Sequence, residues 1–308
     1  MKWKIYRLVA AEADMGSRLD LFIAAAGSEI SRSLAKKVID LGGVHLNGRR
    51  VRSCSTTVRP GDSVEVYLDH LPLDPYRIQP EEILFQDKYL IVLNKPALVE
   101  TQPTHARFKG TLYEALLWYL RNPFRPRLKP EVGMIQRLDR GTSGVILFSI
   151  HQRAHKELTR IFLEHCVEKR YLALVHDCPP EEQGEIRSLL ARSRNENRVC
   201  SVARGGKEAI TRYRVVERFP AAALVELELI TGRSHQIRAH MSELGCPLLG
   251  DVLYGGQDSV AGVNLARPML HSHRLAFSHP VLNQALEFFA PVPEDMIVLR
   301  TKLGEMCV

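Results

Sequence analysis

Residues 136–149 read QRLDRGTSGVILFS, and this stretch decides how the rest of the chain is interpreted. It joins a charged turn to an apolar segment, 145–149, that has the composition of a buried strand. Gly141 and Gly144 favour a sharp turn, so Asp139 is expected beside a rigid strand end. A carboxylate held on such an edge is a candidate catalytic group. The alternative is a turn aspartate that only accepts hydrogen bonds from backbone amides.

The segments around this stretch have mixed strand and helix patterns. Strands are expected at 83–86, 89–94, 144–149, 170–175, 211–217, 223–231 and 284–289, and helices at 111–121, 152–164 and 235–244. Strands and helices do not alternate regularly, which is typical of the α+β class. The expected domain has a mixed, largely antiparallel sheet flanked by helices and loops.

A proline-rich stretch, 71–80 (LPLDPYRIQP), divides the chain. Prolines fix φ and remove amide donors, so this stretch is expected to be a stiff linker. The expected division is an N-terminal module at 1–75, a linker at 76–82 and a catalytic domain at 83–308.

The N-terminal part has the pattern of a small α/β module. Ser31 can cap a helix that runs to Leu41, and Gly42 can end it. Asn47-Gly48 is a strong hairpin signal, because both residues tolerate positive φ. An alternating strand is expected at 63–68.

Bulk composition restricts the function classes. The 308 residues carry a formal net charge of +7, which permits an RNA partner without requiring one. The six cysteines form no CxxC pair, so reduced thiols are expected rather than a zinc ribbon or a disulfide framework. No signal peptide and no apolar run of about 18 residues is seen, so a cytoplasmic protein without membrane contact is expected. The chain has no HExxH, GxGxxG or GxxxxGK[ST] pattern, so we expect no metal and no cofactor.

Two further segments carry candidate chemistry. In 231–240, TGRSHQIRAH, Arg233 lies at a strand-to-helix corner, where it could pair with a carboxylate and keep it ionised. In 168–175, EKRYLALV, Tyr171 could stack on a nucleobase or handle a proton. The alternatives are a solvated arginine and a tyrosine that simply packs in the core.

A basic segment follows the second of these candidates. It holds Arg187, Arg192, Arg194, Arg198, Arg204, Lys207, Arg212 and Arg214. Such a segment is typical of a surface that faces a polyanion, although a merely solvated face gives the same pattern.

Together these segments resemble a known family. Residues from about 83 to 290 resemble the RluA-type pseudouridine synthases, and residues from about 16 to 70 resemble an alpha-L RNA-binding module of the kind found in a small-subunit ribosomal protein. The first likeness is carried by Lys95-Pro96-Ala97, Arg137-Leu138-Asp139, Thr142-Ser143-Gly144, Lys169-Arg170-Tyr171, Gly206-Lys207-Glu208-Ala209, Thr231-Gly232-Arg233, His235-Gln236-Ile237-Arg238, His240, Leu249-Gly250-Asp251 and Tyr254-Gly255. The second is carried by Arg18-Leu19-Asp20, Ser31-Arg32, Gly43-Val44, Asn47-Gly48 and Gly61-Asp62. Gln136, Leu98 and Gln102 depart from the family's usual residues.

The resemblance implies an isomerase that converts uridine to pseudouridine within RNA without a cofactor. Asp139, Tyr171 and Arg233 are the expected catalytic residues, with Arg233 paired to Asp139. The expected RNA-binding residues are Arg18, Arg32, Lys36, Arg49, Arg50, Arg137, Arg140, Lys207, Arg238 and His240. Large-subunit (23S) ribosomal RNA is the expected substrate and a monomer the expected state. Transfer RNA, a non-catalytic ribosome-assembly factor and a metal-dependent nuclease are the alternatives.

Overall fold

The computed structural model describes residues 4–70, 72–193 and 198–306. The chain divides into two compact units. The first comprises Met1–Ile78 with Val99–Pro130, and the second comprises Gln79–Leu98 with Glu131–Val308. Residues 1–3 of the expected module, position 71 of the proline-rich stretch and Arg194 of the basic segment lie outside the described residues.

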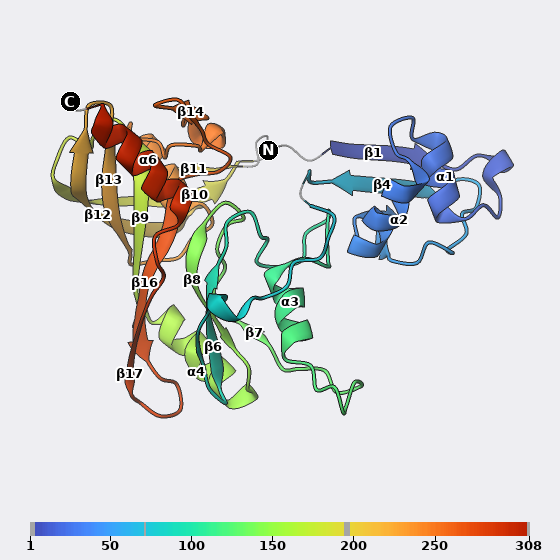
Figure 1. Cartoon of the computed structure of the whole chain (residues 1–308), viewed down its shortest axis with the longest axis horizontal. Helices are drawn as coiled ribbons and strands as arrows, with labels where there is room; N and C mark the ends of the chain where they lie inside the picture. The colour runs from blue at the N-terminus through green and yellow to red at the C-terminus, as the bar shows by residue number, and fades with distance from the viewer. Residues whose placement is uncertain (1–3, 71, 194–197, 307–308) are drawn as a thin grey trace. The chain divides into compact units, whose positions relative to one another are not determined.

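The first unit is a small α/β arrangement. Its described part contains a four-stranded antiparallel sheet in the order β1-β4-β2-β3, beside which α1 and α2 pack (Figure 1). The elements are β1 (Lys4–Val9), a 3-10 turn (Glu12–Asp14), α1 (Leu19–Ala26), α2 (Arg32–Leu41), β2 (Val44–Leu46), β3 (Arg49–Val51), β4 (Ser63–Leu68) and α3 (Leu112–Tyr119).

The expected local features of this unit are confirmed. Ser31 Oγ accepts a hydrogen bond from the Leu34 N–H at 3.2 Å, which caps α2. Gly42 ends that helix with φ of 88°. Asn47 and Gly48 have φ of 49° and 75°, as the hairpin between β2 and β3 requires.

Segment 99–130, which the expected division assigned to the catalytic domain, packs with the N-terminal unit instead. Arg107 donates to Asp69 through Nε at 2.5 Å and Nη2 at 2.7 Å, and both side chains are buried. The Phe108 N–H also donates to the Leu41 carbonyl at 2.6 Å. A buried bidentate ion pair holds its partners in one geometry, so these contacts fix the segment on the module.

The second unit is built on a mixed sheet. Its described residues form an 11-stranded sheet whose main path is β11-β10-β12-β13-β9-β16-β8-β6-β5, with β17 beside β16 and β7 beside β8. The pair β16–β8 is parallel, and the other pairs in the described sheet are antiparallel. The strands are β5 (Ile83–Gln86), β6 (Leu90–Lys95), β7 (Gly133–Met134), β8 (Ser143–Ser149), β9 (Glu168–His176), β10 (Gln183–Arg192), β11 (Val199–Ser201), β12 (Lys207–Phe219), β13 (Ala222–Leu229), β16 (Leu270–Ser278) and β17 (Ala285–Phe289). The remaining elements are α4 (Gln152–Leu163), α5 (Gln236–Glu243), α6 (Glu294–Glu305), 3-10 turns at Pro80–Glu82 and Val252–Tyr254, and the small hairpin β14 (Ser259–Val260) with β15 (Val263–Asn264).

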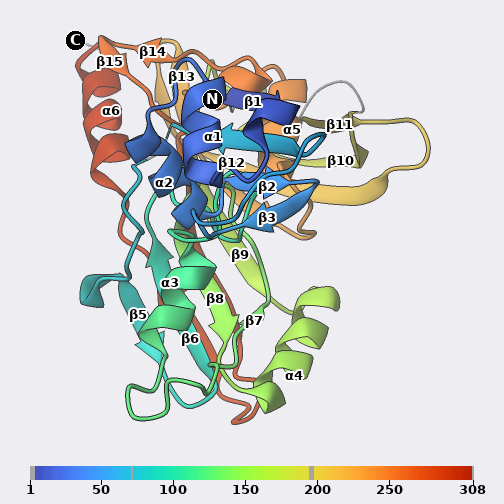
Figure 2. The same cartoon turned by 90° about the vertical axis from the view of Figure 1, so that its right-hand side faces the viewer.

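The two faces of this sheet carry different helices. Register places Tyr171 of β9 opposite Leu227 of β13, and Leu227 opposite Tyr213 of β12, so these side chains share a face. On that face α5 is bonded to β12, because His240 Nδ1 and Thr211 Oγ1 are 2.9 Å apart. On the other face α6 packs against Leu174 (Figures 1 and 2). The expected α+β architecture is therefore confirmed.

Candidate active site

The loop that carries Asp139 is held by a turn hydrogen bond and by a buried lysine. The Thr142 N–H donates to the Asp139 carbonyl at 3.0 Å, which makes the expected turn. Lys95, at the end of β6, is fully buried, and its ammonium donates to the carbonyls of Pro96 at 2.8 Å and Arg140 at 3.4 Å. The Lys-Pro motif at the end of β6 therefore holds the Asp139 loop in place.

Gly144 sets how closely β8 approaches β16. Its φ is +108°, and a Cβ added there would lie 2.1 Å from the Ser272 carbonyl oxygen. Only glycine fits this approach. Ser272 is in turn the register partner of Tyr171 on β9. Because of this glycine, β16 contacts both β8, which follows the Asp139 loop, and β9, which carries Tyr171.

Arg238 of α5, rather than Arg233, pairs with Asp139. Its Nη1 donates to Asp139 Oδ2 at 3.2 Å, while Nε and Nη2 donate to the buried Asp251 at 2.6 and 2.7 Å. Arg233 instead donates through Nε to the Glu208 carbonyl at 2.9 Å. The expected Arg233–Asp139 pair is therefore wrong. Arg238 was expected among the RNA contacts, and that role stays a prediction, since its side chain is 11% exposed beside Asp139.

The charge of Arg238 is secure despite its burial. Burial by itself lowers the pKa of a guanidinium, but the hydrogen bonds and charges of Asp251 and Asp139 outweigh burial and raise the pKa of Arg238 above its ordinary value. The Tyr254 ring lies 4.8 Å from the guanidinium carbon and adds a cation–π contact. Arg238 is therefore a permanent cation that orients the Asp139 carboxylate.

His235 is a further neighbour of Asp139. Its Nε2 is 3.7 Å from Asp139 Oδ2, and its Nδ1 is 3.0 Å from the Tyr254 hydroxyl. Burial lowers the pKa of His235, and the nearby Asp139 carboxylate opposes this only in part. The imidazole is therefore neutral at neutral pH, which leaves Arg238 as the cation of this cluster.

Tyr171 lies within the sheet at the same site. It is 6% exposed and is hydrogen-bonded to Ser272. Burial raises the pKa of Tyr171 to about 12, and the charge of Asp139 adds to this effect. At neutral pH the side chain is therefore an uncharged phenol close to Asp139.

Two buried donors flank the Asp139 turn. Gln136 Nε2 and Arg140 Nη1 have no hydrogen-bond partner among residues 4–70, 72–193 and 198–306. Buried donors rarely remain unpaired, so these are groups that a ligand at the site can satisfy. Arg137, between them, is exposed.

The other expected RNA-binding residues of the second unit, Lys207 and His240, differ in their exposure to solvent. Lys207 is exposed at the start of β12. His240 is fully buried, with Nε2 3.0 Å from Ser188 Oγ. Its expected contact with RNA is therefore wrong, because the imidazole serves the packing of α5 on the sheet.

In the first unit the expected cations divide in the same way. Arg18 and Arg32 both donate to the buried Asp20, at 3.0 and 2.9 Å. Arg50 donates to the Thr104 carbonyl and faces the Phe108 ring. Lys36 and Arg49 are the two expected cations that are exposed and have no ion pair in the described part of the chain. They are therefore free to bind a ligand.

Three arginines of the basic segment are balanced by carboxylates of the same or neighbouring strands. Arg187 contacts Glu185 and Glu208, Arg212 contacts Glu185 and Glu228, and Arg214 contacts Glu226. Exposed pairs of this kind contribute little to stability. They do lower the net positive charge of the strand pair, so this face is less basic than its sequence suggests.

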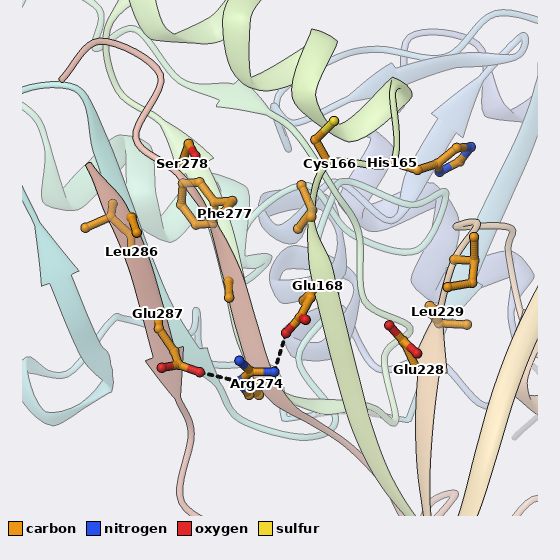
Figure 3. A pocket seen from close by; sticks show the side chains of 14 residues that line it. His165, Cys166, Glu168, Glu228, Leu229, Arg274, Phe277, Ser278, Leu286 and Glu287 are labelled. Carbon is orange, nitrogen blue, oxygen red and sulfur yellow. Dashed lines mark hydrogen bonds and ion pairs between the residues drawn. The ribbon is translucent and has the colours of Figure 1, made fainter. Parts of the chain in front are cut away.

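A hollow of about 540 Å³ lies on the other face of the sheet (Figure 3). Arg274 crosses it and is paired with Glu168 and Glu287. Glu168 neighbours Lys169 in β9 and therefore points to the face opposite Lys169 and Tyr171. None of the Asp139 cluster lines this hollow, so it is separate from the candidate active site.

No group of three or more His, Cys, Asp or Glu side chains in 4–70, 72–193 and 198–306 is arranged to hold a metal ion. In the same residues, no helix has the length and apolar character that crossing a membrane requires.

Several residues of the cluster were not given roles from the sequence. Asp251, Tyr254 and Lys95 stood in noted motifs, but their contacts are tertiary. The same holds for His235, which stood in a noted motif and precedes α5 in a left-handed conformation. Arg238 was expected only among the RNA contacts. Its place within the helix expected at 235–244, which Arg233 precedes, is the signal that separates the two arginines.

Comparison with known proteins agrees with this geometry. Residues 89–243 match the model of the RNA pseudouridylate synthase family, and residues 17–64 match the S4 domain. The uncharacterized RNA pseudouridine synthase YlyB of Bacillus subtilis is 31% identical, covering 95% of this chain and 96% of that protein. Ribosomal large subunit pseudouridine synthase D of Zymomonas mobilis is 33% identical, covering 95% of this chain and 96% of that one.

The solved structures agree as well. Human RNA pseudouridylate synthase domain containing 4 has a TM-score of 0.60 at 25% identity and covers 73% of this chain and 93% of its own. Human RNA pseudouridylate synthase domain containing 1 has a TM-score of 0.54 at 28% identity, with coverages of 68% and 82%. With its Asp139 loop held by Arg238 and its N-terminal S4 domain, the chain belongs to the RNA pseudouridylate synthase family of isomerases.

Proposed function

We propose that this enzyme isomerises specific uridines of large-subunit ribosomal RNA, acting as a cytoplasmic monomer that needs no metal. The observation that carries the chemistry is the Asp139–Arg238–Asp251 chain of ion pairs. Arg238 orients the Asp139 carboxylate, which is partly open to solvent, with 31% of the Asp139 side chain exposed. The choice of RNA is supported by the relative from Zymomonas mobilis, whose name specifies the ribosomal large subunit.

In the proposed reaction the bond between uracil N1 and ribose C1′ breaks, and a bond between uracil C5 and C1′ forms. The C5 proton is lost and N1 gains a proton, so the atoms balance without oxidation or hydrolysis. A carboxylate suits the first step because glycosidic cleavage builds positive charge on the sugar. Asp139 either attacks C1′ or removes the proton on C2′.

The roles of the neighbours follow from their charge states. Tyr171 stacks on the extruded uracil, since a target base must leave its helix to be reached. A phenol with a pKa of about 12 is a poor base at neutral pH, which favours stacking over proton removal by this group. Gln136 and Arg140 donate to the bound nucleotide through their unpaired nitrogens.

The test uses purified wild-type enzyme and Asp139→Asn on RNA from cells that lack the gene. Carbodiimide labelling followed by reverse transcription maps the product in ribosomal and transfer RNA separately. We expect new stops in large-subunit RNA with the wild type, none with the variant, and no effect of chelator. Stops confined to transfer RNA would contradict the substrate, and shortened RNA would indicate a nuclease. Light scattering during size-exclusion chromatography checks the monomer.

A further inference from the structure

Lys169 of β9 is a buried lysine without a counter-ion. It is 7% exposed, and its ammonium makes no hydrogen bond or ion pair with another residue in the described ranges 4–70, 72–193 and 198–306. Lysines buried to this degree normally have an anionic partner. The missing partner therefore calls for an anion from outside the chain.

The surroundings of Lys169 are apolar or cationic. Its register partner on β16 is Leu275, and Tyr171 follows two positions along the same face of β9. A Cβ added to Gly232 would lie 3.8 Å from the ammonium nitrogen, so the strand-to-helix corner passes directly over it. Burial and the nearby Arg233 lower the pKa of Lys169 to about 8.

The nearby carboxylates are engaged elsewhere. Glu168 is bonded to Arg274, and Glu226 to Arg170, on the opposite face of the sheet. Glu228 also follows that face and lies 3.8 Å from Arg212. Asp139 is bonded to Arg238.

Arg233 completes the arrangement. Its Nε donates to the Glu208 carbonyl, which fixes the guanidinium, and no carboxylate of the described chain pairs with it. We propose that Lys169 and Arg233 form an anion subsite that binds a backbone phosphodiester of the RNA beside the target uridine. This rests on the proposed function, because it assigns the phosphate to the same bound nucleotide.

The spacing suits this ligand. Residues two apart on a strand are separated by roughly 7 Å, which is comparable to the reach of one nucleotide from base to phosphate. Tyr171 under the base and Lys169 on the phosphate would therefore fix two ends of a nucleotide whose ribose faces Asp139.

The first experiment separates binding from chemistry. Lys169→Met keeps the length of the side chain and removes its charge, and Lys156→Met, an exposed lysine of α4, is the matched control. On substrate RNA we expect Lys169→Met to raise KM about 10-fold with kcat little changed, because one phosphate contact is lost. Lys169→Arg should restore KM. A lower kcat at unchanged KM would overturn the proposal and indicate a structural or catalytic role.

The second experiment does not need turnover. Binding of fluorescent oligouridylate is measured over a salt series, and each phosphate contact contributes about 0.7 to the slope of log K against log salt for single strands. Lys169→Met should lose about that much, and Lys156→Met none. Wild-type affinity should fall as pH rises through about 8, where the amine of Lys169 loses its proton, and the Lys169→Arg protein should not show this fall.

The two proposals fail in distinguishable ways. If the wild type forms no pseudouridine in any RNA, the proposed function fails, whatever the oligouridylate slopes show. If the wild type is active but the slope and KM of Lys169→Met equal those of the wild type, only the phosphate subsite is wrong.

Discussion

Arg238 is the residue on which the site's electrostatics depend, since its three donors bridge Asp139 and Asp251. Arg238→Ala is expected to lower kcat by at least about 100-fold, the usual loss when a preorganised charge partner is removed. It should also lower the free energy of unfolding by about 3–5 kcal/mol, because Asp251 is left buried and unpaired. Single-turnover assays and urea unfolding measure the two effects.

Arg233→Ala should instead raise KM. A loss of kcat larger for Arg233→Ala than for Arg238→Ala would contradict the assignment of Arg238 as the partner of Asp139.

Replacing Lys169 is expected to raise the stability of the fold, whereas replacing Arg238 is expected to lower it. Its pKa falls from 10.5 to about 8 on folding, so between those values the unfolded chain binds the extra proton and stability rises with pH. Below about pH 8 the folded enzyme bears the full cost of a buried ammonium, on the order of 3 kcal/mol. Lys169→Met should therefore raise Tm at about pH 7, and the gain should shrink towards about pH 10. A Tm below that of the wild type at about pH 7 would show that the charge stabilises the fold.

At this scale the sequence indicated Asp139 and Tyr171, which the structure places close together, but it indicated the wrong arginine as the partner of Asp139. A turn aspartate before an apolar strand is a local pattern. Arg233 and Arg238 are five positions apart, and the start of α5 decides which of them reaches that aspartate. His235 takes a left-handed conformation with φ of 54° and begins the helix after Arg233, so Arg238 faces the site.

At the scale of elements, Gly144 is the position where the β8–β16 pair depends on a missing side chain. Gly144→Ala adds a carbon that meets the Ser272 carbonyl at 2.1 Å, on a backbone with φ of +108°. Strain and overpacking together should cost about 2–5 kcal/mol and reduce activity, because the Asp139 loop precedes this residue. Gly304→Ala in α6 is the matched control, since nothing lies within 4 Å of its added carbon. That variant should be neutral or stabilising by up to about 1 kcal/mol in thermal unfolding. Equal losses from both would contradict a specific role for Gly144.

The elements that the sequence predicted share a clear local pattern. The strand expected at 83–86 coincides with β5, and the helix at 152–164 differs from α4 by one residue. β10 was not predicted, because Gln183–Arg192 mixes glycine, charged and apolar residues and is paired only through β11 and β12. α6 was also missed, although Met296, Leu299 and Leu303 recur at helical spacing.

At the scale of the whole molecule, the first unit is not continuous in sequence. Asp69 and Arg107 are separated by the linker and by β5 and β6, so no local pattern indicates that they pair. Only folding brings them together, because each is costly to bury alone. The proline-rich stretch at 71–80 therefore predicted a boundary in the chain but not the return of Val99–Pro130 to the N-terminal unit.

This return changes how the RNA role of the S4 domain must be tested. Deleting residues 1–75 removes Asp69 and Leu41 and exposes the surface of Val99–Pro130 that packs on the module, so the shortened protein should lose Tm and aggregate. A double variant, Lys36→Ala with Arg49→Ala, removes two exposed cations and leaves the packing intact. We expect its Tm to equal that of the wild type and its salt slope for binding ribosomal RNA to fall by about 2, one for each lost phosphate contact. Lys156→Ala should leave the slope unchanged. An unaltered slope in the double variant would mean that these cations do not bind RNA, a result that the deletion could not give because its instability affects every assay.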